Sequence, residues 1–170
     1  TAACGIYSLE ASAANNKKKE RPNILWVTFE DTSSYEFGCY GNKDVHTPNA
    51  DSLAAQGIQF MNAWSVAPQS SPARSSLITG CYAPTYGMDV HPVSYDTPVD
   101  IFFPQRLREA GYYCTNNSKT HYNSTNNNKA CWDECTKTAS YNSPKRGKDQ
   151  PFFAVFNTVT SHMGRIRTFH

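Results

Sequence analysis

Residues 22–31 read Pro-Asn-Ile-Leu-Trp-Val-Thr-Phe-Glu-Asp, and this run indicates the fold class of the chain. Its middle part, 24–29, is almost entirely apolar, which is typical of a strand buried on both faces of a parallel sheet. Two acids, Glu30 and Asp31, follow at once. Open α/β sheets bind ligands at the carboxyl ends of their strands. We therefore predict a strand over 23–29 that leads into a pair of ligand-binding carboxylates.

Downstream, Pro and Gly divide the chain into alternating helices and strands. The pattern predicts helices over 47–57, 72–79 and 99–110, with Pro104 kinking the last one or delaying its start, and strands over 58–64, 112–115 and 152–157. Residues 116–149 are rich in Asn, Lys and Ser and are predicted to be a long surface excursion. Such alternation predicts an α/β fold.

The composition excludes several classes of protein. With 170 residues, of which 39% are hydrophobic, the chain suits one domain with a sizeable core. A formal net charge of +2 leaves no basic footprint, so we expect no nucleic-acid partner. Because no apolar run reaches about eighteen residues, we expect no transmembrane segment. Six cysteines without CxxC pairs argue against a zinc site and leave disulfide pairing open.

The first residues differ from the rest of the chain. Residues 1–13 are mostly small and apolar and end in Ala-Ser-Ala, a triplet of the kind that signal peptidases cut. We interpret them as the remnant of an export signal, followed by a polar linker over 14–21. An ordinary disordered terminus is the alternative interpretation. An exported bacterial protein of this kind would be periplasmic or secreted.

Residues 68–80 carry the strongest chemical signal. Ser70 lies just ahead of a predicted helix that opens with Pro72, and the free backbone N–H groups of a helix start attract anions. Arg74 follows four residues later, about one helical turn, so its guanidinium reaches the same place. This pair suits an oxyanion ester of sulfur or phosphorus. A capping serine beside a surface arginine is the plain alternative.

The same segment resembles the hallmark of the sulfatase family, within the alkaline-phosphatase superfamily. That hallmark runs Cys or Ser, any residue, Pro, any residue, Arg, and later two apolar residues, Thr and Gly; here it reads Ser70-Ser71-Pro72-Ala73-Arg74 with Leu77-Ile78-Thr79-Gly80. The resemblance implies an alkaline-phosphatase-like, mixed and mostly parallel sheet flanked by helices. It also implies that a maturase oxidises Ser70 to formylglycine, with Gln69 departing from the small or apolar residue usual there.

Four further segments resemble the family in the same order, so the resemblance spans about 22–170. These segments are residues 22–31, 47–60, 111–121 and 151–162. Glu30 departs from the commoner Asp-Asp pair, and Ser118 replaces a usual Gly. His46 and His91 fall outside these segments, and we interpret both as structural.

The resemblance implies a ligand set and a role for each matching residue. Glu30, Asp31 and residue 70 would bind a calcium ion, which prefers oxygen ligands.

Around the sulfate group, Arg74 and Lys119 would neutralise the charge that builds on the sulfuryl oxygens. His121 would orient or deprotonate the formylglycine hydrate, and His162 would protonate the leaving alcohol or amine.

The function that this resemblance implies is hydrolysis of sulfate esters or sulfamates. Residues 132–135 and 157–165 look more like bacterial relatives of heparan N-sulfatases than like arylsulfatases, which favours a glycosaminoglycan or another sulfated carbohydrate as substrate. One alternative is a phosphate mono- or diester hydrolase of the same superfamily, with unmodified Ser70 as the direct nucleophile. A second is a non-catalytic paralogue that binds sulfated glycans.

Residues 22–170 are expected to be only the N-terminal part of a sulfatase catalytic domain, truncated before the C-terminal subdomain. The resemblance implies that an Asp, a further Asn, Gln or His, and a second sulfate-binding Lys come later in the polypeptide. With an incomplete ligand set, the 170-residue chain should bind calcium weakly and be inactive by itself. Isothermal titration calorimetry of this chain measures the affinity, and tight calcium binding would contradict the expectation.

Overall fold

The computed structural model describes residues 21–126 and 128–165. The predicted export signal over 1–13 and all of the predicted linker except Arg21 lie outside the described residues. Within the described ranges, no helix is both long enough and apolar enough to cross a bilayer. The five cysteines that fall in these ranges are all free.

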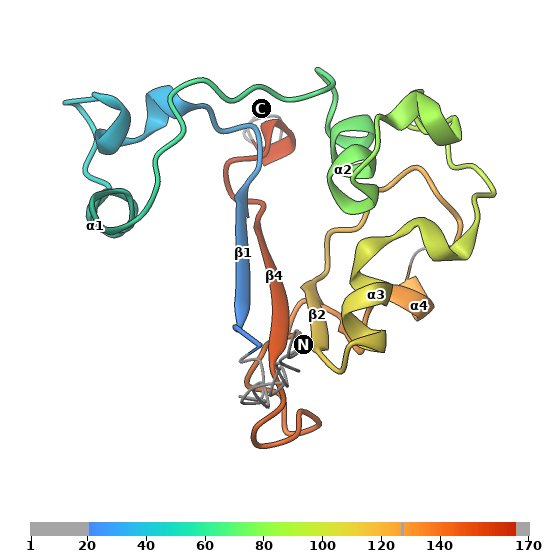
Figure 1. Ribbon diagram of the computed structural model, residues 1–170. Coiled ribbons are helices and arrows are strands. Elements are labelled where there is room, and N and C mark those ends of the chain that lie inside the picture. Colours follow the sequence, from blue (N-terminus) through green and yellow to red (C-terminus); the bar gives the residue numbers. More distant parts are fainter. Residues whose placement is uncertain (1–20, 127, 166–170) are drawn as a thin grey trace, which may run out of the picture.

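A single parallel sheet organises the fold. Its strands are β1 (Ile24–Phe29), β2 (Tyr113–Asn117), β3 (Glu134–Cys135) and β4 (Phe152–Thr158). The spatial order is β1-β4-β2-β3, so the last strand in the chain lies between the first two (Figure 1). Because every pairing is parallel, the carboxyl ends of β1, β4 and β2 meet at one edge. The predicted parallel α/β sheet is confirmed.

Helices of unequal burial accompany the sheet. They are α1 (Pro48–Gln56), α2 (Ser70–Thr79), α3 (Phe103–Glu109) and the short α4 (Asn128–Cys131), with 3₁₀ turns at Ser34–Glu36, Gly38–Tyr40, Ala83–Tyr86 and Val99–Ile101. In Figure 1, α2 and α3 lie on one side of the sheet and α1 lies beyond β1 on the other. The predicted helix over 47–57 is confirmed, and Pro104 delays the start of α3 as expected.

The core lies between the sheet and the pair α2 and α3. Phe153 of β4 is 2% exposed, and its ring centroid lies 6.1 Å from that of Trp26 and 5.9 Å from that of Trp132. Ile78 of α2 and Phe103 of α3 pack into the same cluster. Burial of apolar surface stabilises the fold by about 25 cal/mol for each Å² removed from water. The packing in this cluster therefore holds α2 over the carboxyl end of the sheet.

The start of α2 differs from the prediction. The helix begins at Ser70 rather than at 72, with Gln69 as its N-cap, so Ser70 belongs to the first turn instead of preceding it. Pro72 permits this because the first N–H groups of a helix have no intrahelical partner to lose. Gly80 ends the helix with a φ of 70°, in the left-handed region that glycine adopts without strain.

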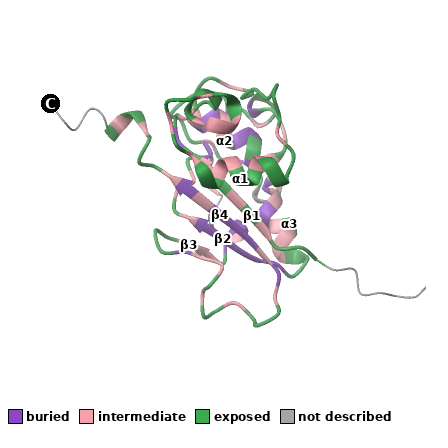
Figure 2. Ribbon diagram, turned by 90° about the vertical axis from the view of Figure 1, so that its left-hand side faces the viewer, coloured by how far each residue is buried: buried purple, intermediate pink, exposed green. Residues whose placement is uncertain are grey.

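The prediction that the first strand is buried on both faces is wrong for one face. Burial alternates along β1, and Leu25, Val27 and Phe29 are each about half exposed, whereas buried residues gather in β2 and β4 (Figure 2). The physical reason is that α2 and α3 pack on the opposite face of the sheet, which leaves this face of β1 uncovered by them (Figure 1).

The predicted strand over 58–64 is also wrong. Within the described residues this stretch is irregular, and Ile58, Phe60 and Trp64 are largely exposed. An apolar run becomes a strand only where a neighbouring strand takes up its N–H and C=O groups. The described sheet offers this stretch no such neighbour.

Residues 116–149 are only partly the surface excursion that was predicted. The segment contains the end of β2 together with α4 and β3, and it sends Tyr122 and Trp132 into the core. The Asn- and Ser-rich composition gave no sign of these two core residues, because the polar residues around them form turns.

Two adjacent residues of α2 test the position of the core. Ile78→Ala should lower the free energy of unfolding by about 2–5 kcal/mol, because the buried side chain leaves a cavity. Leu77→Ala, in which a half-exposed side chain is lost, should change it by about 0.5 kcal/mol or less. Urea denaturation of the 170-residue chain gives both values, and equal effects would contradict this placement of the core.

Candidate active site

An ionic cluster stands at the carboxyl end of β1. The carboxylate of Glu30 is buried, with only 4% of its side chain exposed, and it binds two cations. Its Oε1 accepts a hydrogen bond of 3.1 Å from Arg74 Nη1, and its Oε2 pairs with the ammonium of Lys119. One carboxylate and two cations leave a local formal charge of −1 + 2 = +1. These three side chains by themselves therefore favour a further anion, and the exposed carboxylate of Asp31 nearby reduces that preference.

The guanidinium of Arg74 is held from several directions. Besides Glu30, it donates to the backbone carbonyls of Lys119 at 2.9 Å and Thr120 at 3.3 Å, and to Asn157 Oδ1 at 2.6 Å. These bonds occupy four of the five N–H groups of a guanidinium. Counting partners from the described residues, Arg74 is thus fixed in place with one N–H left at Nη1, while the Lys119 ammonium keeps the larger share of unused donors.

Two asparagines connect the cluster to the sheet, and neither was among the site residues predicted from the sequence. Asn157 of β4 accepts from Thr28 Oγ1 at 2.9 Å and donates to Asn116 Oδ1 of β2 at 2.9 Å. Asn116 donates in turn to the Lys119 carbonyl at 3.0 Å. The available signal was the position of Asn157, a polar residue at the carboxyl end of an otherwise apolar strand.

His121 lies on the turn that follows β2. This turn is sharply folded, since Ser118, His121 and Asn123 have φ values of 62°, 41° and 50°. Partial burial lowers the pKa of His121 below its ordinary value, and the neighbouring His91, Lys119 and Arg74 lower it further. The imidazole is therefore neutral near pH 7 and free to accept a proton.

Ser70 and its neighbour face different surroundings. Ser70 is the first residue of α2, and within the described residues its hydroxyl makes no hydrogen bond. Ser71 is fully buried, and its Oγ lies 2.6 Å from His91 Nδ1. The structure therefore leaves the hydroxyl of residue 70 open to chemistry and anchors that of residue 71.

The loop after β4 brings His162 to the same edge of the sheet. A cavity of about 370 Å³ is lined by Lys119 and His162 together with Val159, Gly164 and Arg165. Ser161 donates to the Glu30 carbonyl at 2.5 Å, and the backbone N–H of Met163 donates to Asp31 Oδ2 at 2.8 Å. Five of the seven predicted site residues thus converge here, through hydrogen bonds, ion pairs or a shared cavity: Glu30, Asp31, Arg74, Lys119 and His162.

The donors at this edge of the sheet are oxygen atoms, the type of ligand that a calcium ion prefers. Calcium takes six to eight oxygen ligands. Each carboxylate oxygen of Glu30 keeps a second lone pair beyond the one used by its cation, and Asp31 is exposed beside it. These donors are too few by themselves, because within the described part of the chain no three His, Cys, Asp or Glu side chains gather as a metal group.

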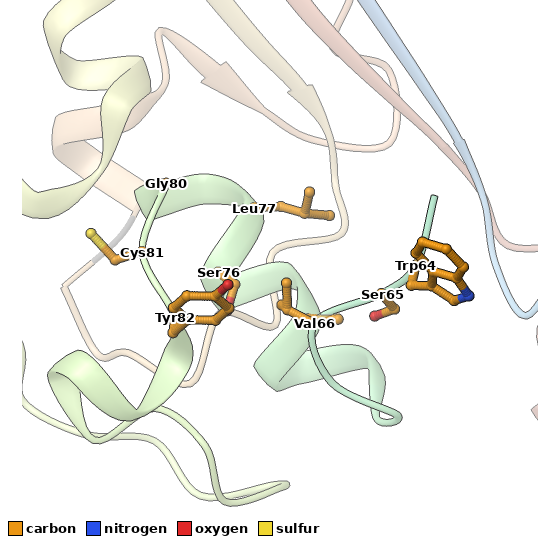
Figure 3. Close-up of a pocket in the computed structure, with 9 residues that line it drawn as sticks. Trp64, Ser65, Val66, Ser76, Leu77, Gly80, Cys81 and Tyr82 are labelled. Atoms are coloured by element: carbon orange, nitrogen blue, oxygen red, sulfur yellow. The ribbon is translucent and has the colours of Figure 1, made fainter. Parts of the chain in front are cut away.

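A second, apolar cavity of about 520 Å³ lies beside α2 and does not belong to this site. Leu77 and Ser76 of α2 border it on one side, and Trp64 and Val66 of the preceding loop border it on the other (Figure 3). No residue of the ionic cluster lines it.

Comparisons with known proteins agree with one another. A family model described as Sulfatase matches residues 22–147. An ulvan-active sulfatase of Formosa agariphila is 36% identical over 88% of this chain and 27% of its own length, and an N-acetylglucosamine-6-O-sulfatase of Bacteroides thetaiotaomicron is 34% identical over 65% and 20%. The chain thus spans about a quarter or less of these relatives.

Solved structures match the fold as well. A protein solved in complex with its substrate D-glucosamine-2-N,6-O-disulfate superposes with a TM-score of 0.71 at 22% identity, over 85% of this chain and 35% of that one. A 2-O glycosaminoglycan sulfatase gives a TM-score of 0.69 at 20% identity, over 88% of this chain and 37% of that one. The predicted alkaline-phosphatase-like fold class is confirmed.

Removing the buried anion tests the ionic cluster. Glu30→Gln should lower the free energy of unfolding by about 3 kcal/mol, because Arg74 and Lys119 then lose their shared counter-charge. Glu109→Gln, which breaks an exposed pair with Arg106, should cost at most about 1 kcal/mol. Urea denaturation compares the two variants. A Glu30→Gln protein as stable as the Glu109→Gln control would rule out a structural role for the ion pairs of Glu30 with Arg74 and Lys119.

Proposed function

The chain belongs to the sulfatase family, and from this we propose that residues 22–170 are the N-terminal part of a catalytic domain that removes sulfate from sulfated carbohydrates. The observation that carries the proposal is the net positive cluster of Glu30, Arg74 and Lys119 at the sheet edge. Arg74 lies one turn after Ser70, so this charge stands close to the open hydroxyl. Such an arrangement suits a sulfate group, which is anionic before and during its transfer.

The substrate class rests on the relatives. The names of two of them specify ulvan and N-acetylglucosamine-6-O-sulfate groups, and one matching structure holds a sulfated glucosamine. These names support a sulfated carbohydrate. Within that class we propose a glycosaminoglycan, with sulfamates included, because residues 157–165 look like bacterial relatives of heparan N-sulfatases.

Residue 70 supplies the nucleophile in this proposal. A maturase oxidises Ser70 to formylglycine, whose hydrate carries two hydroxyls on one carbon. One hydroxyl loses its proton to His121 and attacks sulfur, and the bond from sulfur to the sugar oxygen or nitrogen breaks as His162 protonates that atom. The second hydroxyl then gives its proton to His162, which was left without one by the leaving group, the carbon–oxygen bond to sulfate breaks, and the aldehyde re-forms.

The remaining residues bind and hold charge. Lys119 and Arg74 contact the sulfuryl oxygens and stabilise the negative charge that grows on them. Glu30, Asp31 and residue 70 would hold a calcium ion, whose positive charge lowers the pKa of the attacking hydroxyl. Export to the periplasm or the medium is part of the proposal, because polymeric sulfated glycans lie outside the cell.

Residue 70 gives the decisive test, in the longest natural polypeptide that contains residues 22–170, co-produced with an anaerobic-type maturase. We expect the mass of the Ser70 peptide to be lower by two hydrogens and sulfate to be released from sulfated glycosaminoglycan oligosaccharides. Ser70→Ala should reduce this release by about 10³-fold or more. Ser76→Ala, later on the same helix, is the matched control and should retain activity.

Three outcomes would count against parts of the proposal. An unmodified Ser70 with phosphate-ester hydrolysis would favour the phosphate hydrolase. Glycan binding without turnover would favour the non-catalytic paralogue. Sulfate release from a synthetic aryl sulfate but from no sulfated sugar would overturn the carbohydrate assignment.

A further inference from the structure

A second histidine, His91, touches the helix turn that carries Ser70. Its Nδ1 lies 2.6 Å from Ser71 Oγ, and Ser71 has no exposed surface. A short hydrogen bond to a fully buried hydroxyl holds one edge of the imidazole ring, because Ser71 is enclosed by packed neighbours. His91 is therefore anchored at the residue next to the proposed nucleophile.

The loop of His91 and the loop of His121 form one packed unit. Asn123 donates from Nδ2 to the carbonyls of Met88 at 2.9 Å and Val90 at 3.0 Å, and it is 2% exposed. On the helix side, Ser75 Oγ donates to the Tyr122 carbonyl at 2.6 Å. The loops before His91 and around His121 thus rest on each other and on the serine face of α2.

The two imidazole rings meet within this unit. Their centroids are 5.1 Å apart with planes at 63°, an edge-to-face contact. Among the described residues, the groups that act electrostatically on His121 are His91, Lys119, Arg74 and Glu30, and of these only Glu30 is anionic. His91 is the one aromatic neighbour recorded for His121 among the described residues.

We propose that His91 is a positioning residue for the reaction: anchored by Ser71, it holds the ring of His121 in the orientation that serves residue 70. This inference rests on the proposed function, and it replaces the interpretation of His91 as purely structural. Asn123 already ties the two loops together, so loop stability alone does not require an imidazole at position 91. The imidazole adds a rigid contact from the buried hydroxyl to the proposed base.

The test compares His91→Phe, Ser71→Ala and the double variant in the matured longest natural polypeptide. Each single variant should lower kcat for sulfate release by about 10- to 100-fold with little change in KM, because a misplaced base slows chemistry and leaves binding intact. The double variant should be no slower than the slower single variant, since both changes remove the same hydrogen bond between Ser71 and His91. His46→Phe, at an exposed histidine elsewhere, is the matched control and should keep full activity.

A second readout does not depend on turnover. Burial is the first cause of the low pKa of His121, and His91 is the next. Because His91→Phe keeps the burial and removes only the contribution of His91, the variant should raise that pKa part of the way toward its ordinary value, as followed by the imidazole signals in NMR. The acidic limb of the pH–kcat profile should move to higher pH by the same amount, because His121 must be neutral to accept a proton. A stability change alone would shift neither.

The outcomes separate the two proposals. Unchanged kcat and unchanged His121 titration in His91→Phe would overturn the positioning role, and so would losses in the two single variants that multiply in the double variant. Full activity in Ser70→Ala would overturn the proposed function instead, whatever His91 does. The NMR titration of His121 keeps the structural contact testable in either case.

Discussion

A buried carboxylate that must be neutralised is the constraint from which the site follows. Glu30 is held at the end of β1 by the parallel ladder with β4, out of reach of bulk water. An isolated charge there would be very costly, so the fold supplies two cations from separate elements. The requirement draws α2 and the turn after β2 together over the sheet edge. It also leaves one positive charge in excess, where an anionic substrate would lie.

Two neutral amides hold the cations in place without cancelling that excess charge. Asn157 and Asn116 hold Arg74 and the Lys119 backbone without adding a second negative charge. An aspartate at either position would cancel the cluster's net charge, and it could not make the hydrogen bonds that the amide nitrogens donate. Because the amides belong to β4 and β2, they hold the two cations in fixed positions relative to the sheet. Little reorganisation of these groups is then needed when charge develops.

Prediction succeeded where the determining interactions are local. Three elements depend on apolar runs, caps and backbone preferences within a few residues: β1, the helix between Pro48 and Gly57, and the helix that ends at Gly80. It failed for the apolar run over 58–64, which had every local property of a strand and lacked a partner. It failed in the opposite sense for 116–149, where Tyr122 and Trp132 are core residues set in a polar sequence.

Sequence alone was sufficient to identify the family: an acid pair after a strand, and a hydroxyl with an arginine one turn later, match its ordered pattern. Only the tertiary structure determined how these groups meet. It paired Glu30 with Arg74 and Lys119, recruited two asparagines that carry no motif, and set His91 against Ser71 and His121. The reason is that capping and periodicity act within one or two turns of chain. Burial and charge pairing act between residues dozens of positions apart, and their partners exist only once the sheet has formed.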